Sequence, residues 1–245
     1  MESFQLGPVP AFAAGADGPP IVLLTGPPFS AALFRGVQSR LGPRRTVALE
    51  LLGAAAPNGS AKDLLQAALA ELRPLAVVGH GLAVPLALRC GAERVVISNG
   101  PVSKVDPLMT QLGRLPARGL EQLLRPGVLR TWMPSSAGLR RLVVNPYVMD
   151  HDMAVTLSAP WGSSAAARTL AATWVRELGA LVASEIGEVS EISAIWGDGD
   201  VLYPVAEARR VVPEERLRTV PGGRHLHPVE RPWAFADALV ELLSS

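Results

Sequence analysis

The sequence predicts an α/β protein built around a mainly parallel sheet, and three observations support this fold class. Short, continuously apolar segments recur along the first hundred residues, which is typical of strands buried on both faces. Segments with helical spacing separate these runs, so that strand and helix alternate as they do in βαβ units. The 245 residues are 49% hydrophobic, which is enough to build one large core.

The N-terminal part of the chain provides the first elements. The segment "SFQLGPVPAFAAGA" has two short apolar pieces split by Gly-Pro, which indicates an edge hairpin. Four apolar runs predict strands, and they are "PPIVLLTG", "RTVALEL", "LAVVG" and "RVVIS". The spacing predicts helices over Ser30–Leu41, over Asp63–Leu72 with Ser60 as a possible cap, and after Gly81.

The alternation breaks at Asn99 and resumes near residue 190. Between these points the chain reads as helical pieces separated by prolines and glycines, ending in a longer helix over Ala165–Ile186. After it come a strand "EISAIWG", a helix "AEARRVV", a strand "RLRTVPG" and a closing helix over Pro232–Leu243. We therefore expect a core made of residues 1–99 and 190–245, with a helical cap of residues 100–189. Such a cap would wall a pocket at the C-terminal ends of the strands, where ligands bind in open α/β sheets.

Composition excludes several classes of function. The formal charge of +1 and the absence of a clustered basic face argue against a nucleic-acid partner. No apolar run is long enough to span a bilayer, so no membrane partner is expected. A single cysteine, Cys90, and an N-terminus without the features of a signal peptide predict a cytoplasmic protein. Nothing in the sequence indicates an oligomeric state.

Four segments together resemble the α/β-hydrolase fold family, in its capped subgroup. They are "IVLLTGPPFSAALF", "VVGHGLAVPLAL", "AIWGDGDVLYPVAEARRV" and "VPGGRHLHPVERPWAFADAL". The resemblance implies an eight-stranded, mainly parallel sheet flanked by helices. It also implies an oxyanion loop in the first segment, a nucleophile turn in the second, an acid at Asp200 and a histidine at His225. The family order of nucleophile, acid and histidine is kept by Gly81, Asp200 and His225.

Two departures from the family pattern bear on the chemistry. Glycine stands at the nucleophile position, and Gly81 has no group that could form a covalent intermediate. The family's oxyanion hole takes one N–H from the residue after the nucleophile, here Leu82, and one from the residue after a His-Gly pair. In this chain that pair is Thr25-Gly26 and the next residue is Pro27, which has no N–H. The sequence therefore argues against an ordinary serine esterase.

The remaining candidate residues fall into two groups. His225 and Asp200 are the expected catalytic pair, since an aspartate fixes the tautomer of a histidine and stabilises its charged form; Asp198 is a rival acid. The expected oxyanion or substrate-binding residues are Leu82, Thr25, Gly26, Ser30, Ser98, Trp132, Tyr147 and Trp161. Ser30 could equally cap the next helix. His80 and His227 are expected to support the site, and Cys90 to lie in the core.

The sequence predicts neither a metal nor an organic cofactor. Asp150, His151 and Asp152 are adjacent, but neighbouring residues of a helix point apart and do not share a metal. The G-x-G of "GHGLAV" lacks the third glycine of a dinucleotide fingerprint, because Val84 stands there.

Three functions stay open at this stage. The first is an enzyme that uses His225 and Asp200 as a general base for non-covalent chemistry of the lyase, isomerase, cyclase or decarboxylase type, on a hydrophobic small-molecule substrate such as a natural-product intermediate. The second is a catalytically inactive protein that binds or scaffolds a small molecule in the same pocket. The third is a serine hydrolase whose nucleophile has been mutated, although Pro27 argues against it.

Overall fold

The computed structural model describes residues 2–54, 60–187 and 189–244. Within these residues the strands form one eight-stranded sheet in the order β1-β2-β4-β3-β5-β6-β7-β8. The first three strands in this order pair antiparallel, and every later pair is parallel. The strands are β1 (Glu2–Leu6), β2 (Val9–Ala14), β3 (Asp17–Thr25), β4 (Arg44–Leu49), β5 (Ala76–His80), β6 (Arg94–Ser98), β7 (Glu191–Gly197) and β8 (Leu217–Val220). This confirms the predicted fold class.

The predicted edge hairpin is present as β1 and β2. Leu6 pairs with Val9 across a turn that contains Gly7, whose φ of 54° lies in the left-handed region that glycine adopts without strain. The second strand of the hairpin continues the sheet by pairing with β4, so β1 alone occupies that edge.

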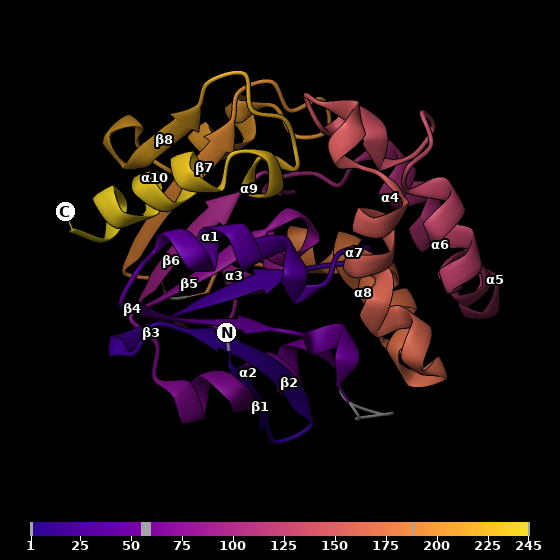
Figure 1. The fold of residues 1–245 in the computed structure, drawn as a ribbon, viewed down its shortest axis with the longest axis horizontal. Coiled ribbons are helices and arrows are strands. Elements are labelled where there is room, and N and C mark those ends of the chain that lie inside the picture. The colour runs from indigo at the N-terminus through magenta and orange to yellow at the C-terminus, as the bar shows by residue number, and fades with distance from the viewer. Residues whose placement is uncertain (1, 55–59, 188, 245) are drawn as a thin grey trace.

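The middle of the sheet is buried on both faces. Every residue of β5 is buried, and valines of neighbouring strands face each other in the parallel register Val22–Val77–Val95. Continuous apolar strands of this kind need helices on both sides. In Figure 1, α1 (Arg35–Arg40) and α10 (Pro232–Ser244) lie on one side of the strands and α2 (Ala61–Leu72) on the other.

The helices of the first half begin where the sequence indicates. Ser60 accepts a hydrogen bond from the N–H of Asp63 and caps α2, as expected. The predicted helix over Ser30–Leu41 is a 3-10 turn η1 (Ala31–Phe34) followed by α1, and Ser30 makes no capping hydrogen bond. A second 3-10 turn, η2 (Leu51–Gly53), follows β4, and η3 (Gly81–Ala83) leads into α3 (Val84–Ala87).

Between β6 and β7 the chain is helical, and these helices lie beyond the ends of the strands, on the right in Figure 1. Prolines open several of them, because a missing N–H costs nothing in the first turn. The elements are α4 (Pro107–Gly113), α5 (Ala117–Leu123), α6 (Pro126–Trp132), η4 (Leu139–Leu142), η5 (Pro146–Val148), α7 (His151–Ser163) and α8 (Ala165–Ala183). Helix α8 is the predicted long helix, and Arg89 binds the carbonyl oxygen of Val182 near its end.

The last part of the chain differs from expectation in one element. The segment predicted as a helix over residues 206–212 is a 3-10 helix, η6 (Val205–Arg210), with hydrogen bonds of the i to i+3 type such as Glu207 N–H to Pro204 O. The short elements η7 (Glu214–Arg216) and α9 (His227–Glu230) precede and follow β8, and α10 closes the chain as predicted. Among the described residues, no helix has the length and apolar character needed to cross a bilayer.

A buried carboxyl group lies directly after β4. The carboxyl of Glu50 accepts a hydrogen bond of 2.7 Å from the N–H of Ala31, which ties the end of β4 to the start of η1. Burial raises the pKa of Glu50 to about 8, and the hydrogen bond from Ala31 opposes only part of the rise. The side chain is therefore neutral in the folded protein at pH 7.

This raised pKa predicts a stabilising substitution. A carboxyl whose pKa is higher in the folded state contributes stability below its unfolded pKa of 4.5, and this contribution is lost as the pH rises through 8. Glu50→Gln keeps an acceptor for Ala31 and removes the ionisation. We expect a gain in the free energy of unfolding of roughly 1–3 kcal/mol at pH 8 and none at pH 4.5, measured by urea unfolding. An equal gain from the exposed control Glu71→Gln, or a loss of stability in Glu50→Gln at pH 8, would contradict this.

Candidate active site

The turn after β5 has a glycine with left-handed backbone at its centre. His80 ends the strand in extended conformation, and Gly81 then takes a φ of 59° at the start of η3. A Cβ added to Gly81 would lie 3.5 Å from Nε2 of His225, with nothing nearer. A side chain at this position would thus point at the histidine. Glycine leaves that space open and relieves the strain that the left-handed φ imposes on other residues.

The backbone of the turn is packed closely against two neighbouring segments. A Cβ on Gly26 would lie 2.9 Å from the carbonyl carbon of Leu82, and one on Gly100 would lie 2.1 Å from the carbonyl oxygen of Gly81. Both positions therefore need glycine. The loop after β3 and the segment after β6 hold the turn from two sides.

His225 and Asp200 lie together although 25 residues separate them. Asp200 follows β7 and His225 follows β8, so the two neighbouring parallel strands bring both residues to the same end of the sheet. Nδ1 of His225 lies 2.9 Å from Oδ2 of Asp200. Because an ionised carboxylate only accepts, Nδ1 donates this hydrogen bond, and Nε2 is the nitrogen that faces Gly81.

The carboxylate of Asp200 is held by two further donors. Nδ2 of Asn99 donates to its Oδ2 at 2.7 Å, and the N–H of Leu202 donates to its Oδ1 at 2.8 Å. Burial by itself would raise the pKa of Asp200, but the nearby His225 and these hydrogen bonds outweigh burial, and the pKa is lowered. Asp200 therefore stays charged and orients His225. The rival Asp198 is exposed and accepts a hydrogen bond from the N–H of Gly222.

Two more histidines surround His225 and are neutral. The ring centroid of His80 lies 5.1 Å from that of His225 and 6.0 Å from that of His227. Burial lowers the pKa of His80 well below its usual value, and His225 and His227 add to the effect. Burial also lowers the pKa of His227 to about 4. Nδ1 of His227 lies 3.0 Å from the carbonyl oxygen of Arg224, so this side chain supports the loop that carries His225.

The loop after Gly26 offers no backbone donor. Pro27 and Pro28 have no N–H, and the N–H of Phe29 donates to the carbonyl oxygen of Gly26. Losing one donor of an oxyanion hole costs about 2.7–4 kcal/mol of transition-state stabilisation in acyl transfer. The sequence indicated that Pro27 lacks an N–H, and the structure shows that none of residues 27–29 has a free one.

A cavity of about 350 Å³ opens on His225. Its walls come from the loop after β3, from the turn after Gly81, and from the helical segment between β6 and β7. Nearly all of the lining is apolar, and the apolar side chains from the helical segment are Leu108, Met109, Leu112, Leu120, Leu123, Leu124, Val128, Leu129, Trp132, Ala137, Leu139, Leu142 and Val175. A cavity of this volume suits a small organic ligand with an apolar body.

The cavity includes part of the expected binding set. Leu82 and Trp132 line it. Thr25 and Gly26 lie beside the turn but are not among the lining residues, and Ser98 is buried with its hydroxyl 3.1 Å from Nδ1 of His80. The neighbouring Asn99 binds Asp200.

Two other expected residues, Ser30 and Tyr147, lie outside this cavity. Ser30 donates a hydrogen bond to the carbonyl oxygen of Thr156 and lines a separate cavity of about 100 Å³ beside Glu50. The side chain of Tyr147 is 78% exposed and lies outside the cavity, with Arg140 over its ring. The side chain of Trp161 lies outside the described residues.

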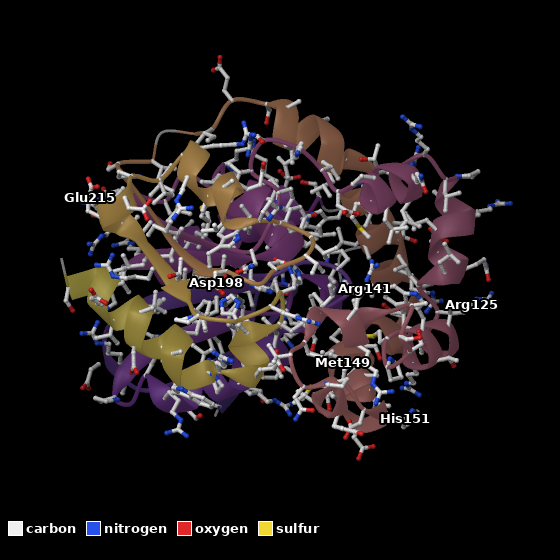
Figure 2. The ribbon with its side chains drawn as sticks, turned by 90° about the horizontal axis from the view of Figure 1, so that it is seen from above. Arg125, Arg141, Met149, His151, Asp198 and Glu215 are labelled. Carbon is white, nitrogen blue, oxygen red and sulfur yellow. The ribbon has the colours of Figure 1, made fainter. Side chains whose placement is uncertain are left out.

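The helical segment also carries the adjacent residues Asp150, His151 and Asp152, for which the sequence predicts no shared metal. Asp150 caps α7 by accepting a hydrogen bond from the N–H of Met153, and His151 begins the helix. In Figure 2, His151 and Met149 lie on the helical segment, away from Asp198 on the side of the sheet. Among the described residues, no three His, Cys, Asp or Glu side chains are grouped as metal ligands.

Sequence reasoning missed three polar residues of the cavity, Asp106, Arg141 and Tyr203, and only Tyr203 among them is buried. Tyr203 is 3% exposed, lines the cavity, and has its ring centroid 6.0 Å from that of His225. It follows Asp200 by three residues, which is the one signal that could have marked it.

Comparisons with known proteins identify the fold. No family model and no curated protein matches the sequence. Solved structures match over nearly the whole chain, and three of them are an α/β hydrolase fold protein from Burkholderia ambifaria (21% identity, 95% of this chain and 93% of that chain, TM-score 0.65), the haloalkane dehalogenase DatA from Agrobacterium tumefaciens C58 (17%, 96% and 92%, 0.74) and a thermophilic esterase from Thermogutta terrifontis (18%, 100% and 98%, 0.71). At these identities the likeness shows the fold alone: the chain has the α/β-hydrolase fold.

The neutral state of His227 predicts a loss of stability in acid. A histidine whose pKa is lowered in the folded state contributes stability above its unfolded pKa of 6.5, and this is lost as the pH falls toward 4. Protonation of His227 accounts for roughly 3 kcal/mol of this loss in the free energy of unfolding. His227→Asn can still donate to Arg224, and we expect it to flatten the fall in the free energy of unfolding between pH 6.5 and 4. The exposed control His151→Asn should keep the full slope, and a slope unchanged in His227→Asn would refute the assignment.

A serine placed at the turn should fold but should not make an efficient esterase. Gly81→Ser would put a hydroxyl near Nε2 of His225, at a stability cost of about 1 kcal/mol for the left-handed φ. Because residues 27–29 offer no donor, we expect hydrolysis of p-nitrophenyl butyrate to stay slow, and to rise roughly 10²-fold when Pro27→Ala adds an N–H. Gly81→Ser alone reaching the rate of the double variant would show that the loop is not limiting.

Proposed function

We propose that the protein is an enzyme of α/β-hydrolase fold that uses His225, oriented by Asp200, as a general base for non-covalent chemistry on a hydrophobic small molecule. The single observation that carries this proposal is the direction of His225. Its Nδ1 is bound by Asp200, its Nε2 lies 3.5 Å from the position that a Cβ on Gly81 would take, and its side chain lines the apolar cavity.

The geometry favours proton transfer over acyl transfer. Gly81 has no group to attack a carbonyl, and the loop from Pro27 to Phe29 has no N–H to bind the resulting oxyanion. The histidine–aspartate pair needs neither group to accept a proton, since Asp200 stabilises the imidazolium that forms. A positioned base of this type contributes roughly 10²–10⁴-fold to a proton-transfer step.

The surroundings of His225 suit an acidic C–H or O–H of the substrate. The space above Gly81 lets a substrate atom approach Nε2 where a serine hydroxyl would otherwise lie. Burial lowers the pKa values of His80 and His227, so both are poor proton acceptors and place no second charge beside His225. The apolar walls keep water away from the base. Lyase, isomerase, cyclase and decarboxylase reactions all include or can follow such a proton transfer.

The proposal predicts that His225 and Asp200 act as one unit. We expect His225→Ala to lower kcat/KM by 10²–10⁴-fold and Asp200→Asn to lower it to a similar extent, because the wrong tautomer would face the substrate. The reactions to follow by NMR in D2O are α-proton exchange of aryl ketones, decarboxylation of aryl β-keto acids and retro-aldol cleavage of aryl β-hydroxy ketones.

A control separates this enzyme from an inactive binding protein. His151→Ala removes an exposed histidine of α7 and should leave every rate unchanged. Equal conversion by wild type and His225→Ala across all three reaction types, together with retained ligand binding, would reject the general base and support the catalytically inactive alternative.

A further inference from the structure

The polar groups of the cavity are distributed unequally between its buried and its open parts. Four side chains other than the apolar ones line it: Asp106, Arg141, Tyr203 and His225. Tyr203 and His225 are buried, with 3% and 4% exposure. Arg141 is exposed, and it is labelled on the helical segment in Figure 2. A ligand would therefore meet an apolar wall along most of its surface and one buried polar end.

Tyr203 is fixed by its backbone and not by its hydroxyl. The indole N–H of Trp196 donates to the carbonyl oxygen of Tyr203 at 2.8 Å, and the N–H of Leu202 is bound by Asp200. The hydroxyl is buried, and its proton has no acceptor among the described residues. Burial and the charge of Asp106 raise the pKa of Tyr203 above its usual value, and the backbone N–H of Asp106 opposes part of this rise. The hydroxyl proton is thus retained and free to be donated.

A buried donor without an acceptor is uncommon in folded proteins, because its lost hydration is not replaced. The carboxylate of Asp106 caps α4 by accepting from the N–H of Leu108, and it makes no hydrogen bond with the hydroxyl of Tyr203. The same cavity is lined by His225, and residues 27–29 beside it offer no free backbone N–H. A single ligand oxygen at the buried end would satisfy the hydroxyl and would occupy the position next to His225.

We propose that the hydroxyl of Tyr203 is the donor for a substrate carbonyl oxygen, and that the substrate class is an apolar ketone or related carbonyl compound with hydrogen on the α-carbon. The catalytic part rests on the proposed function of His225. Nε2 takes the α-proton, the C–H electron pair forms the C=C bond, and the carbonyl π pair moves to oxygen. The enolate oxygen then accepts the hydrogen bond from Tyr203, and the imidazolium later returns the proton.

The binding test uses two ligands that differ only at the carbonyl. 1-Tetralone and tetralin share their ring system, with C=O in one and CH2 in the other. Tyr203→Phe removes only the hydroxyl. We expect this variant to bind 1-tetralone about tenfold more weakly in titration calorimetry and to bind tetralin with unchanged affinity. Tyr147→Phe, which removes the hydroxyl of the exposed tyrosine outside the cavity, should change neither affinity.

The outcomes decide the inference. Tyr203→Phe weakening both ligands equally, or neither, would overturn it, and so would failure of both ligands to bind wild type. Unchanged tetralin affinity and melting temperature show that the variant is folded, so that a selective loss of 1-tetralone affinity reports the hydroxyl.

A second measurement separates this inference from the proposed function. Deuterium incorporation at C2 of 1-tetralone in D2O should be slowed 10–100-fold in Tyr203→Phe and lost in His225→Ala. Selective loss of 1-tetralone binding in Tyr203→Phe without any exchange by wild type would keep the carbonyl site and reject the base. Exchange that needs His225 but is untouched by Tyr203→Phe would keep the base and reject the carbonyl site.

Discussion

The carboxylate of Asp200 connects the parts of the chain that make the site. It accepts hydrogen bonds from the imidazole of His225 after β8, from the amide of Asn99 after β6 and from the backbone of Leu202 in its own loop. Residues that follow three adjacent parallel strands, β6, β7 and β8, therefore contact one another through a single buried carboxylate. A buried carboxylate is stable only with such donors. Its lowered pKa keeps it charged, and the charge fixes which nitrogen of His225 faces the cavity.

Two features of the site bear on its chemistry: the missing side chain at Gly81 and the missing free N–H groups of the loop from Pro27 to Phe29. The first leaves room beside Nε2 of His225, and the second leaves no free backbone N–H on residues 27–29 for an oxyanion. Both features agree with the proposed role of His225 as a general base that forms no covalent intermediate. The hydroxyl of Tyr203 would supply from a side chain what the loop no longer supplies from its backbone.

The order of the motifs was enough to predict the fold and the relation of Gly81, Asp200 and His225. These residues stand at strand ends, where the position in the sequence decides the position in space. The cavity lining could not be predicted in the same way. Leucines of α4–α6 read as ordinary core, since only the packing of several short helices decides which face is left uncovered. Tyr147 was expected inside and lies on the surface for the same reason. Tyr203 lay inside a recognised motif, and its free hydroxyl is visible only once every neighbouring acceptor is placed.

A crystal structure of the protein with 1-tetralone would test the central claim most directly. The account predicts that the α-carbon lies above Gly81 within contact of Nε2 of His225, with the carbonyl oxygen at hydrogen-bond distance from the hydroxyl of Tyr203. A ligand bound with its hydrocarbon ring against His225, or a space above Gly81 filled by an apolar side chain, would contradict it.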